Sequence, residues 1–203
     1  MTASYASQEL DLRLWRQLYQ TYTLLKQCED RIYEEHGLTT EQYAVLVSIS
    51  YLGQPARITD IARWLERSTN SISMIVDRMV KAGLVKRARD KGDRRVVYVS
   101  KTSKAESLFK PASVAGFESV RRILSPIPHT DKVTLLDLLG EVKYETMKCL
   151  DPAVDIAAVK KDELRRSKDI KDWARKYGSS SACKARSEGG QKRRSVRNHP
   201  MTA

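Results

Sequence analysis

The stretch from Ile58 to Val99 constrains the fold of this chain more than any other part of the sequence. It contains two short amphipathic segments separated by a tight turn, and a charged hairpin pattern follows at once. Helical spacing gives the second segment one apolar stripe: Ile72, Ile75, Val76 and Met79. The opposite face carries Asn70, Ser73, Met74, Asp77 and Lys81, with Arg78 at its edge. The pattern predicts a helix that is buried on one side only.

Two short strands are predicted after this helix, at residues 84–89 and 96–100. The six residues between them form a turn with charged flanks. Because a two-stranded ribbon is only marginally stable alone, it must pack on the helices. Three helices followed by a hairpin predict a winged helix-turn-helix, in which the polar face of the second segment lies in a DNA groove. The hairpin favours this interpretation over a surface helix of an unrelated small domain.

Helix-start signals divide the region before the hairpin. Thr39, Thr59 and Ser68 are the expected N-caps, because their side chains can accept a hydrogen bond from the first turn. Gln42 follows Thr39 at the spacing of a capping box. Gly83 is expected just beyond the end of the last helix.

Long apolar helices are predicted on both sides of the winged helix. The first carries two apolar stripes, and the segment after Thr130 is too apolar for a lone surface helix, so both suit a dimer-forming bundle better than a monomer. The fold class is therefore mainly α with a small β-hairpin wing (α+β). The predicted parts are an N-terminal dimerisation helix (7–36), the winged helix-turn-helix (37–102), C-terminal dimerisation helices (103–150), a basic helical extension (151–177) and a disordered basic tail (178–203).

Charge and composition restrict the partners. Lys and Arg outnumber Asp and Glu by 37 to 25, and the resulting net charge of +12 favours a polyanionic partner such as nucleic acid. Three scattered cysteines and three isolated histidines suggest no metal site and no cofactor. The sequence has no secretory signal and no apolar run of membrane-spanning length, so we expect a cytoplasmic protein that does not enter a membrane.

Residues 7–150 resemble the MarR family of bacterial and archaeal winged-helix transcription regulators. The match is most specific where STNSISMIVDRMVKAGLV is followed by DKGDRRVVYVS, in which Asp93-Arg94-Arg95 fits the family's D-x-R pattern. The resemblance implies a homodimer whose first and last helices interlock. Each recognition helix would enter a major groove of double-stranded DNA, and each wing would reach the neighbouring minor groove. Lys101 departs from the family, which commonly has Leu at this position.

The resemblance also implies DNA contacts by position. On the recognition helix these are Thr69, Asn70, Ser71, Ser73 and Arg78. On the wing they are Arg95 and Arg94, with Asp93 stabilising the tip. Arg57, Ser68, Met74 and Lys91 complete the predicted DNA-binding set.

The predicted function is sequence-specific regulation of transcription, with the chain acting as a repressor on a pseudo-palindromic operator. The alternative is an architectural or protein-interaction winged-helix protein that binds DNA mainly without sequence preference. An enzyme is not expected, because the sequence lacks a G-x-S-x-G motif, a phosphate-binding glycine loop and an H-E-x-x-H motif.

Members of the family often bind small phenolic or aromatic effectors between the dimer bundle and the DNA-binding lobe. By this resemblance, four aromatic side chains are candidates to line such a site: Trp15, Tyr19, Tyr22 and Tyr43. An aromatic stripe at helical spacing is also typical of an ordinary core, and both interpretations stay open at this point.

Overall fold

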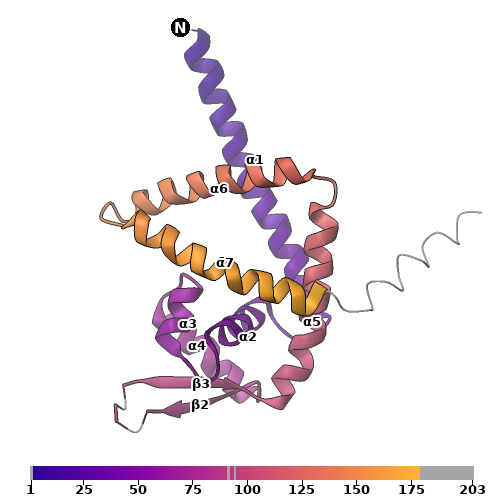
Figure 1. Ribbon diagram of the computed structural model, residues 1–203, viewed down its shortest axis with the longest axis vertical. Coiled ribbons are helices and arrows are strands. Elements are labelled where there is room, and N and C mark those ends of the chain that lie inside the picture. The colour runs from indigo at the N-terminus through magenta and orange to yellow at the C-terminus, as the bar shows by residue number, and fades with distance from the viewer. Residues whose placement is uncertain (1, 91, 94, 179–203) are drawn as a thin grey trace, which may run out of the picture. The chain divides into compact units, whose positions relative to one another are not determined.

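The chain is mainly helical with one small antiparallel sheet, as predicted (Figure 1). The structure, a computed structural model, describes residues 2–90, 92–93 and 95–178. The helices in this part of the chain are α1 (Thr2–Glu34), α2 (Thr40–Leu52), α3 (Ile58–Trp64), α4 (Thr69–Lys81), α5 (Ser103–Leu124), α6 (His129–Leu150) and α7 (Ile156–Gly178). The strands are β1 (Ala56–Arg57), β2 (Val85–Arg89) and β3 (Val97–Lys101).

Two compact units make up the chain, Met1–Gly116 and Phe117–Ala203. The first contains α1 to α4, the sheet and the beginning of α5. The second contains the rest of α5 together with α6 and α7. The predicted winged helix therefore lies within a single unit.

The sheet has the strand order β1-β3-β2. β3 pairs with β2 from Val97, opposite Arg89, to Lys101, opposite Val85. It also pairs with β1, where Val99 lies opposite Ala56. The central place of β3 suits its β-branched and aromatic residues. The sequence pattern does not predict β1, because two residues are too few to show an alternation.

The hydrophobic core of the winged helix includes one face of α4. The predicted apolar stripe is buried, since each of its members is at most 5% exposed: Ile72, Ile75, Val76 and Met79. Neighbouring elements contribute side chains that are fully shielded from solvent: Val45, Leu46, Ile49, Ile61, Val99 and Phe109. This packing fixes which face of α4 is left to solvent.

Aromatic contacts join the end of α1 to α2 and α5. The ring centroids of Tyr33 and Tyr43 are 3.9 Å apart, and those of Tyr43 and Phe109 are 5.5 Å apart. Tyr43 Oη donates a hydrogen bond to Ser113 Oγ at 3.3 Å. Burial raises the pKa of Tyr33 far above its ordinary value, so its hydroxyl stays protonated.

Hydrogen bonds at the helix starts agree in part with the predicted caps. Thr39 Oγ1 accepts from the Gln42 N–H at 3.2 Å, and the Gln42 side chain accepts from the Thr39 N–H at 3.0 Å, which is the predicted capping box. Ser68 is also an N-cap. The prediction for Thr59 is wrong: α3 begins at Ile58, because the chain passes directly from β1 into the helix.

In the second unit, polar side-chain contacts connect α6 to α7. Glu163 of α7 forms an ion pair with Lys143 and accepts a hydrogen bond from Tyr144 Oη at 2.6 Å. Lys160 Nζ lies 4.5 Å from the centroid of the Tyr144 ring and 3.8 Å from the Glu141 carboxylate. The predicted helical extension is thus a helix that polar contacts connect to α6. The tail predicted to be disordered lies, from residue 179 onward, outside the described residues.

Candidate nucleic-acid interface

α4 presents a face of mixed chemistry to solvent. The predicted contact residues on this helix are all exposed or half-buried: Thr69, Asn70, Ser71, Ser73, Met74 and Arg78. Beyond its end, Gly83 adopts a φ of +70°, a left-handed conformation that favours glycine and terminates the helix. The burial of the stripe and the turn at Gly83 together orient the polar face.

Ser68 and Ser71 have a local structural role at the start of α4. Ser68 Oγ accepts from the Ser71 N–H at 3.2 Å and donates to Ser71 Oγ at 2.9 Å. The two hydroxyl groups therefore hydrogen-bond to each other, and that of Ser68 caps the N-terminus of α4. Thr69, Asn70 and Ser73 are the remaining short polar groups of the predicted set on this helix.

Aspartates shape the turn between β2 and β3. Asp90 Oδ1 accepts the backbone N–H of Asp93 at 3.0 Å and that of Gly92 at 2.8 Å, and these bonds lower the pKa of the Asp90 carboxyl. Asp93 Oδ1 accepts the N–H of Arg95 at 2.9 Å. Asp93 therefore contributes a hydrogen bond within the wing turn, and its predicted role at the wing tip stays a prediction. The contribution of Asp90 was not singled out from the sequence, although an Asp two residues before a Gly is a turn signal.

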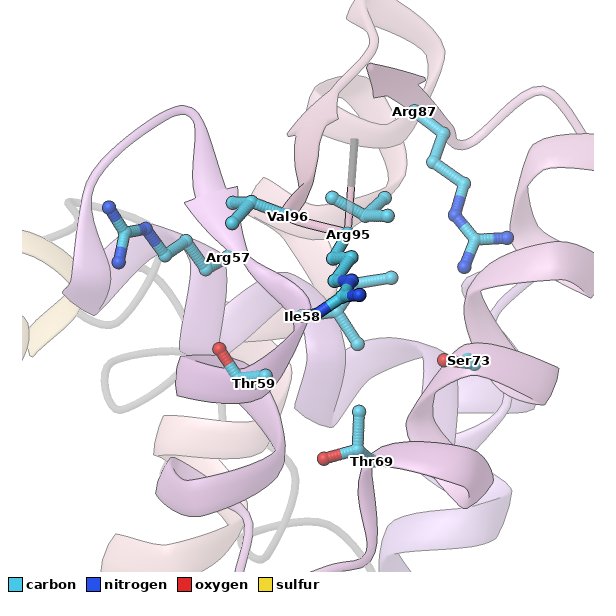
Figure 2. A pocket seen from close by; sticks show the side chains of 9 residues that line it. Arg57, Ile58, Thr59, Thr69, Ser73, Arg87, Arg95 and Val96 are labelled. Carbon is cyan, nitrogen blue, oxygen red and sulfur yellow. The ribbon is translucent and has the colours of Figure 1, made fainter. Parts of the chain in front are cut away.

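A cavity of about 210 Å³ lies between the wing, the start of α3 and α4 (Figure 2). Its lining consists of Arg57, Ile58, Thr59, Thr69, Ser73, Arg87, Arg95, Val96 and Val97. In Figure 2, Arg87 and Arg95 extend from the wing toward the helices, and Thr69 and Ser73 lie across from them on α4. Among the described lining residues there is no carboxylate, so guanidinium and hydroxyl donors dominate the chemistry.

Two of the lining arginines are held by neighbouring side chains. Arg87 of β2 is ion-paired with Asp77 of α4. Arg57 Nε donates to Tyr98 Oη at 3.3 Å, and in Figure 2 its guanidinium points away from the centre of the cavity. Arg57 therefore lies at the outer flank, whereas Arg87 faces α4. Such planar, permanently charged donors suit phosphate oxygens and guanine edges.

The structure brings together part of the predicted set and adds to it. Arg57, Thr69, Ser73 and Arg95 line one cavity. Lys91 and Arg94 lie outside the described residues. Sequence reasoning missed Thr59 of α3 and Arg87 of β2, because only the folded chain brings both elements to one cavity beside α4.

The four aromatic side chains predicted for an effector site are not gathered in one place. Tyr43 is 9% exposed and stacks on Tyr33, whereas Trp15, Tyr19 and Tyr22 are 65%, 69% and 64% exposed along α1. Tyr22 precedes Tyr33 by eleven residues, which is about 16 Å along a helix. The aromatic stripe of α1 and the buried Tyr43 are therefore separate features.

The described residues contain no group of three or more His, Cys, Asp or Glu side chains arranged to hold a metal ion. Within the same part of the chain, no helix is both long and apolar enough to cross a membrane.

Residues 38–97 match the model of the MarR family. The HTH-type transcriptional regulator PecS of Dickeya dadantii (strain 3937) is 27% identical over 122 residues, covering 59% of this chain and 74% of PecS. The transcriptional activatory protein BadR of Rhodopseudomonas palustris (strain ATCC BAA-98 / CGA009) is 33% identical over 110 residues, covering 53% of this chain and 63% of BadR.

Among solved structures, the chain is similar to the organohalide sensing RdhR-CbdbA1625 transcriptional regulator. The TM-score is 0.63 at 25% identity, over 69% of this chain and 83% of that protein, for both its ligand free and its 2,4-dichlorophenol bound forms. These matches confirm the resemblance to the MarR family and the winged-helix fold. The matched proteins are transcription regulators rather than enzymes, as predicted.

Proposed function

We propose that this chain, a MarR-type winged-helix protein over residues 38–97, is a sequence-specific DNA-binding regulator of transcription. The observation that carries the proposal is the convergence of Arg87 and Arg95 from the wing with Thr69 and Ser73 of α4 around one cavity. These side chains supply donors for phosphate oxygens and base edges. The polar face of α4 would lie in a major groove, and Arg95 would reach the adjacent minor groove, whose negative potential attracts arginine.

The acting unit in this proposal is a homodimer. Along α1 the single chain leaves large apolar side chains exposed: Leu10, Leu12, Leu14, Trp15, Tyr19, Tyr22 and Leu24. α6 does the same with Leu135, Leu136, Leu138, Leu139 and Val142. Exposed large apolar side chains in such number mark an interaction site, and a second copy of the chain would cover them. A two-fold dimer predicts a pseudo-palindromic operator with half-sites about one helical turn apart.

Selection of bound duplexes from a random library by the full chain tests this function. Binding of the selected duplex is then measured against an excess of random DNA at fixed salt. A sequence-specific regulator should prefer its duplex by at least about a thousandfold. Competition by random DNA at equal concentration would instead support the alternative, an architectural protein that binds DNA without sequence preference.

We also propose repression by the DNA-bound dimer and release by a small aromatic effector. Support for the effector comes from the similarity to a regulator with a 2,4-dichlorophenol bound form. BadR is named as an activatory protein, so the direction of control needs its own measurement, a promoter reporter with and without the chain. Titration of substituted phenols into the DNA-binding assay should lower the affinity. If no phenol shifts it, the effector part of the proposal fails.

A further inference from the structure

Met74 is an exposed apolar side chain in the middle of the polar face of α4. It is 58% exposed, and the 100° turn per residue places it opposite the buried stripe. Asn70 lies one turn before it and Arg78 one turn after it, and both are exposed. Val80, another exposed apolar residue of α4 at 39%, lies instead beside the buried stripe. Met74 therefore occupies the part of α4 that would project deepest into a groove.

The cavity beside the wing does not explain why the side chain at position 74 is apolar. Its lining takes Thr69 and Ser73 from one side of α4, and Met74 is not part of it. The face is thus divided into a side rich in hydroxyl groups, next to the arginines of the wing, and a centre that carries a thioether. A polar or charged side chain at this centre could hydrogen-bond to phosphates and base edges. The apolar side chain of Met74 suits an apolar group of the DNA instead.

The floor of the DNA major groove offers one distinctive apolar group, the C5-methyl group of thymine. A methionine side chain suits contact with it, because the chain is unbranched, flexible and polarisable. We infer that Met74 recognises thymine by packing its thioether against this methyl group. The inference rests on the proposed DNA-binding function and adds to it the base that the centre of α4 prefers.

The test replaces thymine by 2′-deoxyuridine, which lacks only the methyl group. Each thymine of the selected duplex is exchanged in turn, and the affinity of the full chain is measured by titration. At one thymine in each half-site, loss of the methyl group should weaken binding about fourfold, the change expected when one buried methyl group is removed.

Two variants assign the effect to Met74. Met74→Gln has nearly the same size but is polar, and it should bind the thymine and uracil duplexes equally well. Met74→Leu keeps an apolar side chain and should keep the discrimination. Since the position is exposed, both variants should unfold at the wild-type denaturant midpoint, and that measurement accompanies the titrations.

The outcomes separate the inference from the proposed function. If the chain prefers no selected duplex over random DNA, the proposed function fails and the inference fails with it. If the preference is present but no thymine is sensitive to loss of its methyl group, only the inference is overturned. The same holds if Met74→Gln discriminates between thymine and uracil as strongly as the wild type does.

Discussion

Asp77 of α4 and Arg87 of β2 form an ion pair that joins the polar face of α4 to the wing. Their side chains are 55% and 31% exposed, so the pair itself contributes only about 0–1 kcal/mol to stability. The position of this ion pair matters more than its contribution to stability. Arg87 lines the cavity beside α4, and Asp77 adds a negative charge to a face that is otherwise suited to DNA.

Asp77→Asn should therefore change binding more than folding. Without the carboxylate, repulsion of phosphates decreases and affinity for random DNA should rise. Arg87 also loses the partner that fixes its position, so the preference for the selected duplex should fall. Both dissociation constants are measured at two salt concentrations, with Asp172→Asn at an exposed site on α7 as a control for the same change in charge. An unaltered affinity for random DNA together with an unaltered preference would contradict this role.

Arg95→Ala tests the wing directly. If Arg95 contacts the minor groove, the variant should lose about 1–3 kcal/mol of operator affinity. Arg175→Ala removes the same charge from an exposed site on α7 and serves as the matched control. Wild-type affinity in the Arg95 variant would show that the wing is not used.

Asp90→Ala separates the shape of the wing from its charge. The substitution raises the net charge, which alone would strengthen DNA binding, but it removes the acceptor of two backbone N–H groups in the wing turn. We expect the loss of order to dominate and the affinity to fall. The pKa of Asp90 is lowered in the folded wing, so its contribution is present above the unfolded pKa and is lost as the pH falls through the folded one. A rise in affinity at neutral pH would contradict the structural role.

Features that depend on neighbouring residues could be predicted from the sequence. The stripe on α4 follows from helical spacing, the Thr39 capping box from two residues three positions apart, and the turn after α4 from Gly83. The polar face and the wing that carry the candidate site belong to this class. Their patterns depend on residues that are close together in the sequence.

Features that depend on contacts between segments distant in the sequence could not be predicted. Asp77 and Arg87 belong to different elements, and only the packing of the wing on α4 brings them together. The family resemblance groups Tyr43 with the aromatic residues of α1, yet its stacking partner is Tyr33 rather than the stripe of α1. Sequence spacing describes one helix or strand at a time, whereas these contacts depend on how separate elements pack together.

Lys101, the departure from the family pattern at the end of β3, is buried in a polar network. Its side chain is 7% exposed, and Nζ lies 2.8 Å from Glu106 Oε2 and 2.9 Å from Ser50 Oγ. Glu106→Ala would leave a buried ammonium group without its nearby carboxylate, and we expect it to lower the free energy of unfolding by about 3 kcal/mol. Lys101→Met removes the buried charge and should cost clearly less. Urea denaturation of both variants checks the order, and equal losses would contradict it.

The sequence beyond Gly178 carries six basic residues and one acidic residue. We expect a chain that ends at Gly178 to keep the denaturant midpoint of the full chain, because the α6–α7 contacts through Glu163 are retained. Its DNA affinity should depend less steeply on salt, since each phosphate contact contributes about 0.9 to the slope of log K against log salt. A full-length variant with the six basic residues changed to Gln separates charge from length. If the terminal charges contact phosphate, this variant and the shortened chain should show the same reduced slope, whereas a wild-type slope in both would exclude such contacts.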